Sequence, residues 1–194
     1  YPHSQADAFE TSALQAAVVD MQTGAMLMEK DADSEMFPAS MTKMMTAYLL
    51  FERIKTGGLC LEDTFPVSEK AWRKGGSKMF VKVGDRVKVE DLIRGIVVQS
   101  GNDATIVVAE GIAGSEGAFA DLMTEKALEL GMSGTTFRNA SGWPDPEHVT
   151  TARDLATLAV ASIRNFPELY KYYSEKSFTY NNIKQGNRNP LLYK

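Results

Sequence analysis

The sequence contains one cysteine, no long hydrophobic run and no concentration of positive charge. Cys60 has no partner for a disulfide within the chain, and we expect it to be a small buried apolar residue rather than a reactive thiol. No apolar run approaches the length of a membrane span. The 21 Lys and Arg residues are scattered among 25 Asp and Glu residues, for a net charge of −4. Nucleic-acid-binding proteins gather their basic residues on one face, so we expect no nucleic-acid partner.

The patterns of metal and phosphate sites are also missing from the sequence. No group of Cys, His, Asp or Glu residues has metal-ligand spacing, and Gly75-Gly76-Ser77 is too short for a phosphate-binding loop. We therefore expect neither a metal nor a cofactor. Residues 1–11 are polar and lack the regions of a signal peptide, so we expect a flexible tail there. If the protein is exported, its signal peptide has already been removed.

Hydrophobic periodicity predicts the elements of the fold. Two apolar runs on either side of a turn predict a hairpin at 13–28, and short strands are expected at 81–89 and 177–182. Ser115 and Thr151 are expected to cap helices. Helical periodicity covers 40–54, 90–100, 103–112, 115–130 and 151–165. Helices in the middle with strands near both ends predict an α+β fold, a helical cluster packed on an antiparallel sheet.

Ser40 and Lys43 are the first candidates for chemistry. Residues three positions apart share one face of a helix, so the two side chains are close enough to hydrogen-bond. Ser40 would lie in the first turn, where the positive end of the helix dipole favours developing negative charge. The helix is apolar on most of its circumference, and burial lowers the pKa of a lysine. A neutral Lys43 could then accept the Ser40 proton and create a nucleophile.

Ser100-Gly101-Asn102 lies in the short break between two apolar helices. Its hydroxyl and amide groups could transfer a proton and hold a substrate carbonyl. The alternative is structural: Gly101 would end one helix and Asn102 would cap the next. His148 is the remaining candidate, in a proline-rich loop. No Asp or Glu spacing marks a partner for it, so a loop histidine without a role is the alternative there.

Together, Ser40-Met41-Thr42-Lys43 and Ser100-Gly101-Asn102 match the first two motifs of the penicillin-recognising serine enzymes. The surrounding sequence resembles the low-molecular-mass D-alanyl-D-alanine carboxypeptidases over about residues 12–194. The stretches that carry this resemblance are 38–48, 75–80, 99–104, 151–154 and 185–189.

The resemblance implies a β-lactamase/transpeptidase-like fold with a penicillin-binding catalytic domain at 12–194. It implies that Ser40 is acylated, that Lys43 accepts its proton, and that Ser100 and Asn102 serve proton transfer and substrate positioning. Gly76, Ser77 and His148 are expected to contact substrate. The implied partners are peptidoglycan stem peptides and β-lactams that mimic D-Ala-D-Ala, and the implied location is periplasmic or extracytoplasmic.

The third motif of that family, Lys-Thr-Gly on a strand, is expected beyond Asn189, so we expect the domain to be truncated before it, without its C-terminal strands. A membrane-surface contact through a C-terminal region would be missing with them. Lys55-Thr56-Gly57 has the right letters, but it ends the Ser40 helix about three turns away and is predicted to be a helix stop. We therefore expect the chain alone to be impaired.

Three alternatives remain open. A D,D-endopeptidase of the same family would carry the same side-chain motifs. A class A β-lactamase usually has Asp in the middle of the second motif, where this chain has Gly101. A non-catalytic fragment that binds muropeptides is the third, and the missing third motif is its main support.

Overall fold

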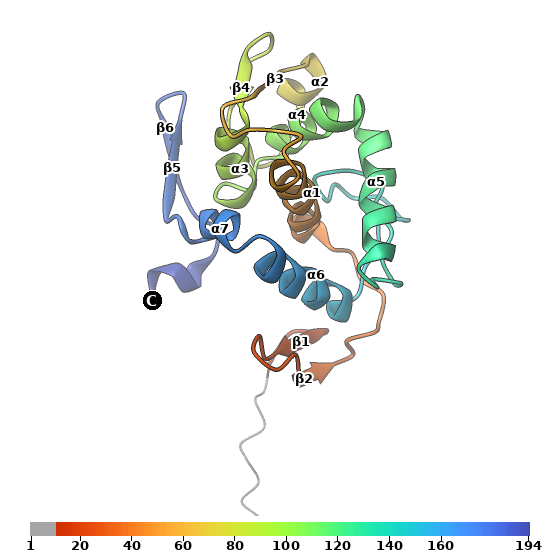
Figure 1. The fold of residues 1–194 in the computed structure, drawn as a ribbon. Helices are drawn as coiled ribbons and strands as arrows, with labels where there is room; N and C mark the ends of the chain where they lie inside the picture. The colour runs from red at the N-terminus through yellow and green to blue at the C-terminus, as the bar shows by residue number, and fades with distance from the viewer. Residues whose placement is uncertain (1–10) are drawn as a thin grey trace, which may run out of the picture.

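The computed structural model describes residues 11–194, so the tail predicted at 1–11 lies outside the described residues except for Thr11. The described residues fold as a cluster of helices with three small antiparallel strand pairs at its edges (Figure 1). The helices are α1 (Lys43–Lys55), α2 (Glu69–Arg73), α3 (Val89–Val97), α4 (Asn102–Ala113), α5 (Glu116–Glu129), α6 (Ala152–Asn165) and α7 (Pro167–Tyr170). Short 3-10 turns occupy Ala39–Thr42, Lys171–Ser174 and Pro190–Tyr193.

Helix α1 lies at the centre of the cluster, in contact with α3, α4, α5 and α6 (Figure 1). Its side chains from Met45 to Phe51 are all buried, as predicted for a helix that is apolar nearly all round. Helix α4 is buried in the same way from Asn102 to Ala109. The core around these two helices fixes the start of α1 and the start of α4, which carry the two sequence motifs.

The predicted helix boundaries are largely confirmed. The Ser115 Oγ accepts a hydrogen bond from the Ala118 N–H at 3.1 Å, and the Thr151 Oγ1 accepts one from the Asp154 N–H at 3.1 Å. Gly131 follows α5 with φ +83°, a left-handed conformation that glycine adopts without strain. Thr56 and Gly57 (φ +77°) end α1, so the Lys-Thr-Gly letters there form a helix stop as predicted.

Strands pair as β1 (Ala16–Val19) with β2 (Met26–Lys30), β3 (Thr64–Pro66) with β4 (Arg86–Lys88), and β5 (Ser177–Tyr180) with β6 (Ile183–Gly186). The hairpin predicted at 13–28 is confirmed, and the strand predicted at 177–182 is confirmed as β5. The antiparallel strands form three separate pairs rather than one sheet. Residues 81–83, predicted as a strand, are irregular, because the N–H of Val81 bonds to a carboxylate instead of a strand partner.

The hairpin β1–β2 lies against α6 at one end of the molecule (Figure 1). Arg153, at the start of α6, joins the two with ion pairs to Glu29 at 2.8 Å and Asp33 at 2.6 Å. A cavity of about 490 Å³ lies between the hairpin and the helix. These contacts position the segment that leads from β2 to Ser40.

The prediction that Cys60 is buried was wrong. Its side chain is exposed, and its backbone N–H donates to the Asp63 Oδ2 at 2.7 Å in the turn that follows α1. The polar turn at this point outweighs the usual preference of cysteine for the interior.

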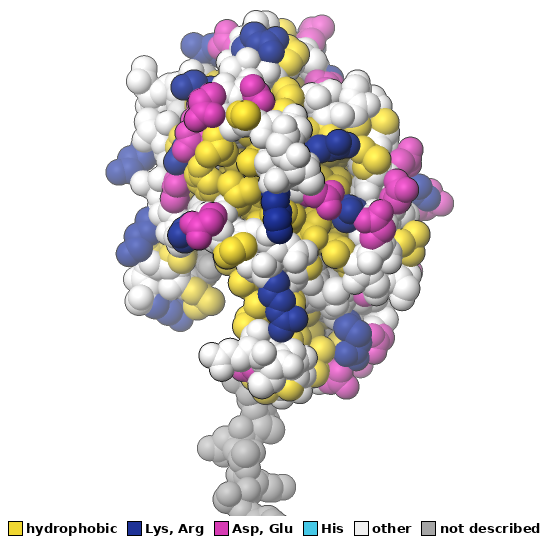
Figure 2. Space-filling model, in the orientation of Figure 1, with side chains coloured by type: hydrophobic (Ala, Val, Ile, Leu, Met, Phe, Trp, Pro, Cys, Tyr) yellow, Lys and Arg dark blue, Asp and Glu magenta, His cyan; other side chains and the backbone are white. Residues whose placement is uncertain are grey.

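Positive and negative side chains are interspersed over the face shown in Figure 2, around hydrophobic side chains in its middle. This distribution agrees with the mixed charge of the sequence. Among the residues that the structure describes, no helix combines the length and apolar character needed to cross a bilayer.

Candidate active site

Ser40 lies in the 3-10 turn Ala39–Thr42 that leads into α1, so the sequence prediction of an α-helix from Ser40 was correct in place but not in helix type. Ala39, immediately before it, has φ +46°, a left-handed conformation that costs a non-glycine residue about 1–3 kcal/mol. Ser40 is exposed, whereas Thr42 and Lys43 are buried. The turn therefore presents one hydroxyl to solvent above a buried amine.

The Lys43 ammonium lies beside that hydroxyl. Its Nζ is 3.3 Å from the Ser40 Oγ and 2.8 Å from the Ser141 carbonyl oxygen. Burial, together with the nearby positive charges of Arg188 and Lys74, lowers the pKa of Lys43 to about 8. A lysine with this pKa is partly neutral near physiological pH, so it can accept a proton from Ser40.

The loop 139–148 supports the Ser40 turn from one side. The Asn139 Oδ1 accepts hydrogen bonds from the backbone N–H groups of Ser141, Gly142 and Trp143, which folds the loop tightly. A Cβ added to Gly142 would lie 1.7 Å from the Ala39 carbonyl oxygen, so only glycine fits there. The loop and the strained turn are in direct backbone contact.

His148 is part of this support. Its ring is buried, and its Nδ1 accepts a hydrogen bond from the Arg138 N–H at 3.0 Å. A neutral ring whose Nδ1 accepts must carry its proton on Nε2, which then donates to the Thr42 Oγ1 at 2.7 Å. Burial lowers the pKa of His148 and so favours this neutral form.

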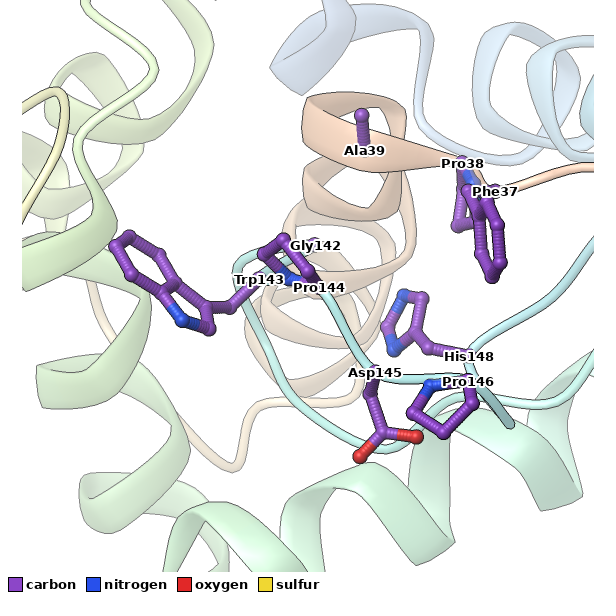
Figure 3. Close-up of a pocket in the computed structure, with 9 residues that line it drawn as sticks. All are labelled: Phe37, Pro38, Ala39, Gly142, Trp143, Pro144, Asp145, Pro146 and His148. Carbon is purple, nitrogen blue, oxygen red and sulfur yellow. The ribbon is translucent and has the colours of Figure 1, made fainter.

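The ring of His148 lines a cavity of about 430 Å³ with Phe37, Pro38 and the prolines of its own loop (Figure 3). The indole of Trp143, from the same loop, points away from the His148 ring in this view. This cavity is not the one that Ser40 and Lys43 line. The expectation that His148 contacts substrate therefore stays a prediction, whereas its hydrogen bond to Thr42 gives it a structural role that sequence spacing could not show.

Ser40 and Lys43 open into a cleft of about 310 Å³. Ser100 lines the same cleft, so the structure brings the first two motifs together. Ser100 has φ +57°, the second strained non-glycine residue of the site. The cleft is completed by side chains of the Ser40 turn, α1, α3, α7, the 3-10 turn Lys171–Ser174 and the segment 187–189, namely Met41, Met44, Ile96, Val97, Tyr170, Tyr173, Asn187, Arg188 and Asn189.

Asn102 joins this cleft to the loop at 75–77. Its backbone N–H donates to the Ser77 carbonyl oxygen at 2.7 Å, and its Nδ2 donates to the Gly75 carbonyl oxygen at 2.9 Å. A Cβ on Gly76 would come within 2.6 Å of the Asn102 Nδ2, so the backbone passes directly over this side chain. Asn102 is the first residue of α4, and Gly101 is its N-cap, so the N-cap alternative for Asn102 was wrong. The role of Asn102 in substrate positioning stays a prediction.

The geometry combines a buried amine with a pKa of about 8, an exposed hydroxyl and a second hydroxyl in one cleft. This arrangement agrees with a comparison of the whole sequence: residues 2–194 match the family model described as D-alanyl-D-alanine carboxypeptidase. The chain belongs to this family.

Curated relatives carry the same description. The D-alanyl-D-alanine carboxypeptidase DacC of Escherichia coli is 42% identical over 182 residues, which are 91% of this chain and 46% of DacC. DacA of Haemophilus influenzae is 41% identical over 91% of this chain and 46% of its own length. The chain thus spans about half the length of these carboxypeptidase relatives.

Solved structures of the family share the fold. Penicillin binding protein 5 from Haemophilus influenzae is 40% identical with a TM-score of 0.92, over 95% of this chain and 54% of that one. Penicillin-Binding Protein D2 from Listeria monocytogenes, solved in an ampicillin-bound form, is 29% identical with a TM-score of 0.83 over 95% of this chain and 75% of its own. The α+β, transpeptidase-like fold is thereby confirmed.

One residue of the cleft was not among the predicted site residues. Arg188 lines the cleft, and its Nη2 donates to the Ser77 Oγ at 3.0 Å. Ser77 itself was predicted. The sequence signal that could have identified Arg188 was its place in 185–189, between two asparagines. That stretch contributed to the family resemblance, but none of its residues was assigned a role. In the described part of the chain, no three His, Cys, Asp or Glu residues come together to hold a metal.

Proposed function

We propose that the protein containing this chain is a serine D,D-carboxypeptidase, which removes the terminal D-alanine of peptidoglycan pentapeptides through an acyl-enzyme on Ser40. The observation that carries the proposal is the Lys43 Nζ, buried with a lowered pKa and 3.3 Å from the exposed Ser40 Oγ. A nucleophile with an adjacent base of matched pKa is what acyl transfer requires.

The proposed reaction has two steps. Neutral Lys43 accepts the Ser40 proton while the Ser40 Oγ bonds to the carbonyl carbon of the penultimate D-alanine. The C–N bond then breaks, and the departing D-alanine amine receives a proton from Lys43 directly or through Ser100. Water next attacks the ester, which releases the shortened peptide with a new carboxylate and restores the Ser40 hydroxyl.

Backbone and side-chain groups around Ser40 are proposed to stabilise this reaction. The Ser40 N–H lies in a first turn, where N–H groups have no intrahelical partner, and it is proposed as one donor to the oxyanion. Asn102 is proposed to hold the substrate amide, with Gly76 and Ser77 forming the adjacent wall of the cleft. The remaining oxyanion donor is proposed to come from the third motif of the family.

The cellular setting follows from the same proposal. An enzyme of peptidoglycan stem peptides works in the periplasm or at another extracytoplasmic site, and contact with the membrane surface is proposed for the full-length protein. β-lactams are proposed inhibitors that acylate Ser40. A relative from Pseudomonas aeruginosa called D-alanyl-D-alanine endopeptidase is 33% identical over 90% of this chain, whereas the carboxypeptidases DacC and DacA reach 42% and 41%. Release of a terminal residue is therefore favoured over cleavage of cross-links.

The test uses the full-length protein. Intact-mass spectrometry before and after ampicillin, with peptide mapping, should show one penicilloyl adduct on the peptide that contains Ser40. A synthetic peptide ending in D-Ala-D-Ala should release D-alanine. Ser40→Ala should abolish both results, and Ser34→Ala, at an exposed serine six residues earlier, should change neither. An adduct on another residue, or D-alanine release by Ser40→Ala, would overturn the proposal.

A further inference from the structure

Asp103, the second residue of α4, is a buried carboxylate whose neighbours are mainly backbone N–H groups. Its Oδ1 accepts hydrogen bonds from the N–H of Met79 and of Ala104, both at 2.9 Å. Its Oδ2 accepts from the N–H of Phe80 at 2.9 Å and of Val81 at 3.2 Å. Only 1% of Asp103 is exposed, so these four bonds replace the water that a carboxylate requires.

Three consecutive N–H groups can point at one anion only if the chain turns sharply between them. The turn is made at Phe80, where φ is +68° and the residue is not glycine. Alternation of right- and left-handed residues produces this kind of anion-binding concavity. The Phe80 ring does not hold the turn by burial, because 44% of the residue is exposed. The Asp103 carboxylate is therefore the main force that holds Phe80 in its strained conformation.

The same carboxylate holds the second part of the loop that is proposed to form a wall of the cleft. Residues 75–81 form a single loop, and its first part is bonded to Asn102 through Gly75 and Ser77. Asp103 follows Asn102 directly, so two neighbouring residues of α4 hold the two halves of the loop.

On its outer side the 75–81 loop meets the hairpin β5–β6. The Asn181 Nδ2 donates to the Phe80 carbonyl oxygen at 2.8 Å, and the Gln185 Nε2 donates to the Lys78 carbonyl oxygen at 2.9 Å. Asn181 is exposed and Gln185 is half-buried, so water competes with these bonds. The buried bonds to Asp103 are charge-assisted and stronger, which makes α4 the firmer of the two supports.

We infer that Asp103 is a positioning residue. It holds the 75–81 loop in the position in which Gly76 and Ser77 contact an extended peptide substrate. The inference rests on the proposed function for its substrate, but the anchoring of the loop is independent of it. Asp103 does not line the cleft with Ser40 and Lys43, so the acyl transfer itself does not require its carboxylate.

The variant Asp103→Asn tests this role with almost no change of shape. An amide has one acceptor oxygen, so in either orientation its NH2 group faces two backbone donors. We expect KM for the peptide ending in D-Ala-D-Ala to rise by about tenfold or more, from the loss of bonds to a charged group. We expect kcat to stay within about threefold of the parent value, and likewise the maximal rate of Ser40 acylation by a saturating β-lactam. A contact that binds the ground state and the transition state equally changes KM and leaves kcat unchanged.

Asp154 is a matched control. It is also buried, and its Oδ2 accepts from the Gly134 N–H at 2.9 Å and the Thr135 Oγ1 at 2.7 Å. Asp154 lies in α6 and lines neither of the cavities at the Ser40 turn. Asp154→Asn should lower Tm as Asp103→Asn does, but leave KM unchanged. Equal KM values for parent and Asp103→Asn, or equal KM increases in the two variants, would refute the inference.

Hydrogen exchange of the unmodified protein supplies a second test, which does not depend on folding of a variant or on any activity. The N–H groups of Phe80 and Val81 lie in an irregular loop, yet they should exchange about as slowly as those of α4, because their acceptor is buried. Fast exchange at these two positions would refute anchoring by Asp103. If exchange is slow but the full-length protein releases no D-alanine, the proposed function is refuted and the anchoring of the 75–81 loop by Asp103 is supported.

Discussion

Acylation of Ser40 is expected to depend on pH through the protonation of Lys43. Burial, together with the charges of Arg188 and Lys74, lowers the pKa of Lys43 from 10.5 to about 8. With this pKa, roughly one molecule in ten has a neutral Lys43 at pH 7 and roughly nine in ten at pH 9, so the acylation rate should rise about tenfold. A cation brought to the site by the third motif would move this rise to lower pH.

The assay is the rate of Ser40 acylation by a fluorescent penicillin at limiting concentration, measured from pH 6 to pH 10 with the full-length protein. Parallel circular dichroism at each pH confirms that the protein is folded. Lys43→Met, which approximates the length of the side chain without its charge, should abolish acylation. A rate that stays flat from pH 6 to pH 9, or that rises only near pH 10, would refute the role of Lys43 as the proton acceptor.

The same pKa has a consequence for stability. Because the folded pKa of Lys43 lies below the unfolded value, the unfolded chain binds more protons between pH 8 and 10.5, and stability should rise with pH across that window. Below pH 8, charging of the buried amine costs on the order of 3 kcal/mol. Lys43→Met should therefore unfold at a higher urea concentration than the parent at pH 7, with a smaller difference above pH 10.

Two further predictions concern the support of the Ser40 turn. Gly142→Ala should reduce Ser40 acylation strongly and destabilise the fold by about 1–3 kcal/mol, because its Cβ would overlap the Ala39 carbonyl oxygen. The control Gly117→Ala in α5, where nothing lies within 4 Å of the added Cβ, should stabilise the fold slightly. Equal effects of the two changes on urea unfolding and on acylation would contradict the reasoning. His148→Phe should destabilise by about 2 kcal/mol through its two lost hydrogen bonds and lower kcat; a rise in KM alone would instead assign His148 to substrate binding.

Sequence reasoning succeeded where the deciding interactions were local. The helix ends at Ser115, Gly131 and Thr151 depend on capping groups within a few residues, and each was predicted correctly. The Ser40 and Lys43 pair is also local, since a spacing of three residues places both side chains on one helical face. The family resemblance then supplied what the spacing could not, namely that Ser100 shares the same cleft.

Predictions failed or stayed incomplete where partners lie far apart in the chain. The strand expected at 81–83 is absent because Asp103 takes the Val81 N–H, a contact that alternation of apolar residues does not reveal. His148 had no visible partner because Thr42 lies 106 residues away. The strands of the described residues form three separate antiparallel pairs, and this grouping depends on tertiary packing that the sequence patterns do not reveal.

The left-handed residues Ala39, Phe80 and Ser100 bear on any attempt to make this protein more thermostable. Ser100 lines the cleft, Ala39 precedes Ser40, and Phe80 lies in the 75–81 loop. Together they store several kcal/mol of backbone strain, at about 1–3 kcal/mol per residue. Glycine at these positions would relieve the strain, but it would also let the Ser40 turn and the 75–81 loop relax into other conformations. A stabilised variant should therefore take its substitutions from surface helices such as α5 and leave these three residues unchanged, because the catalytic geometry depends on the conformations that destabilise the fold.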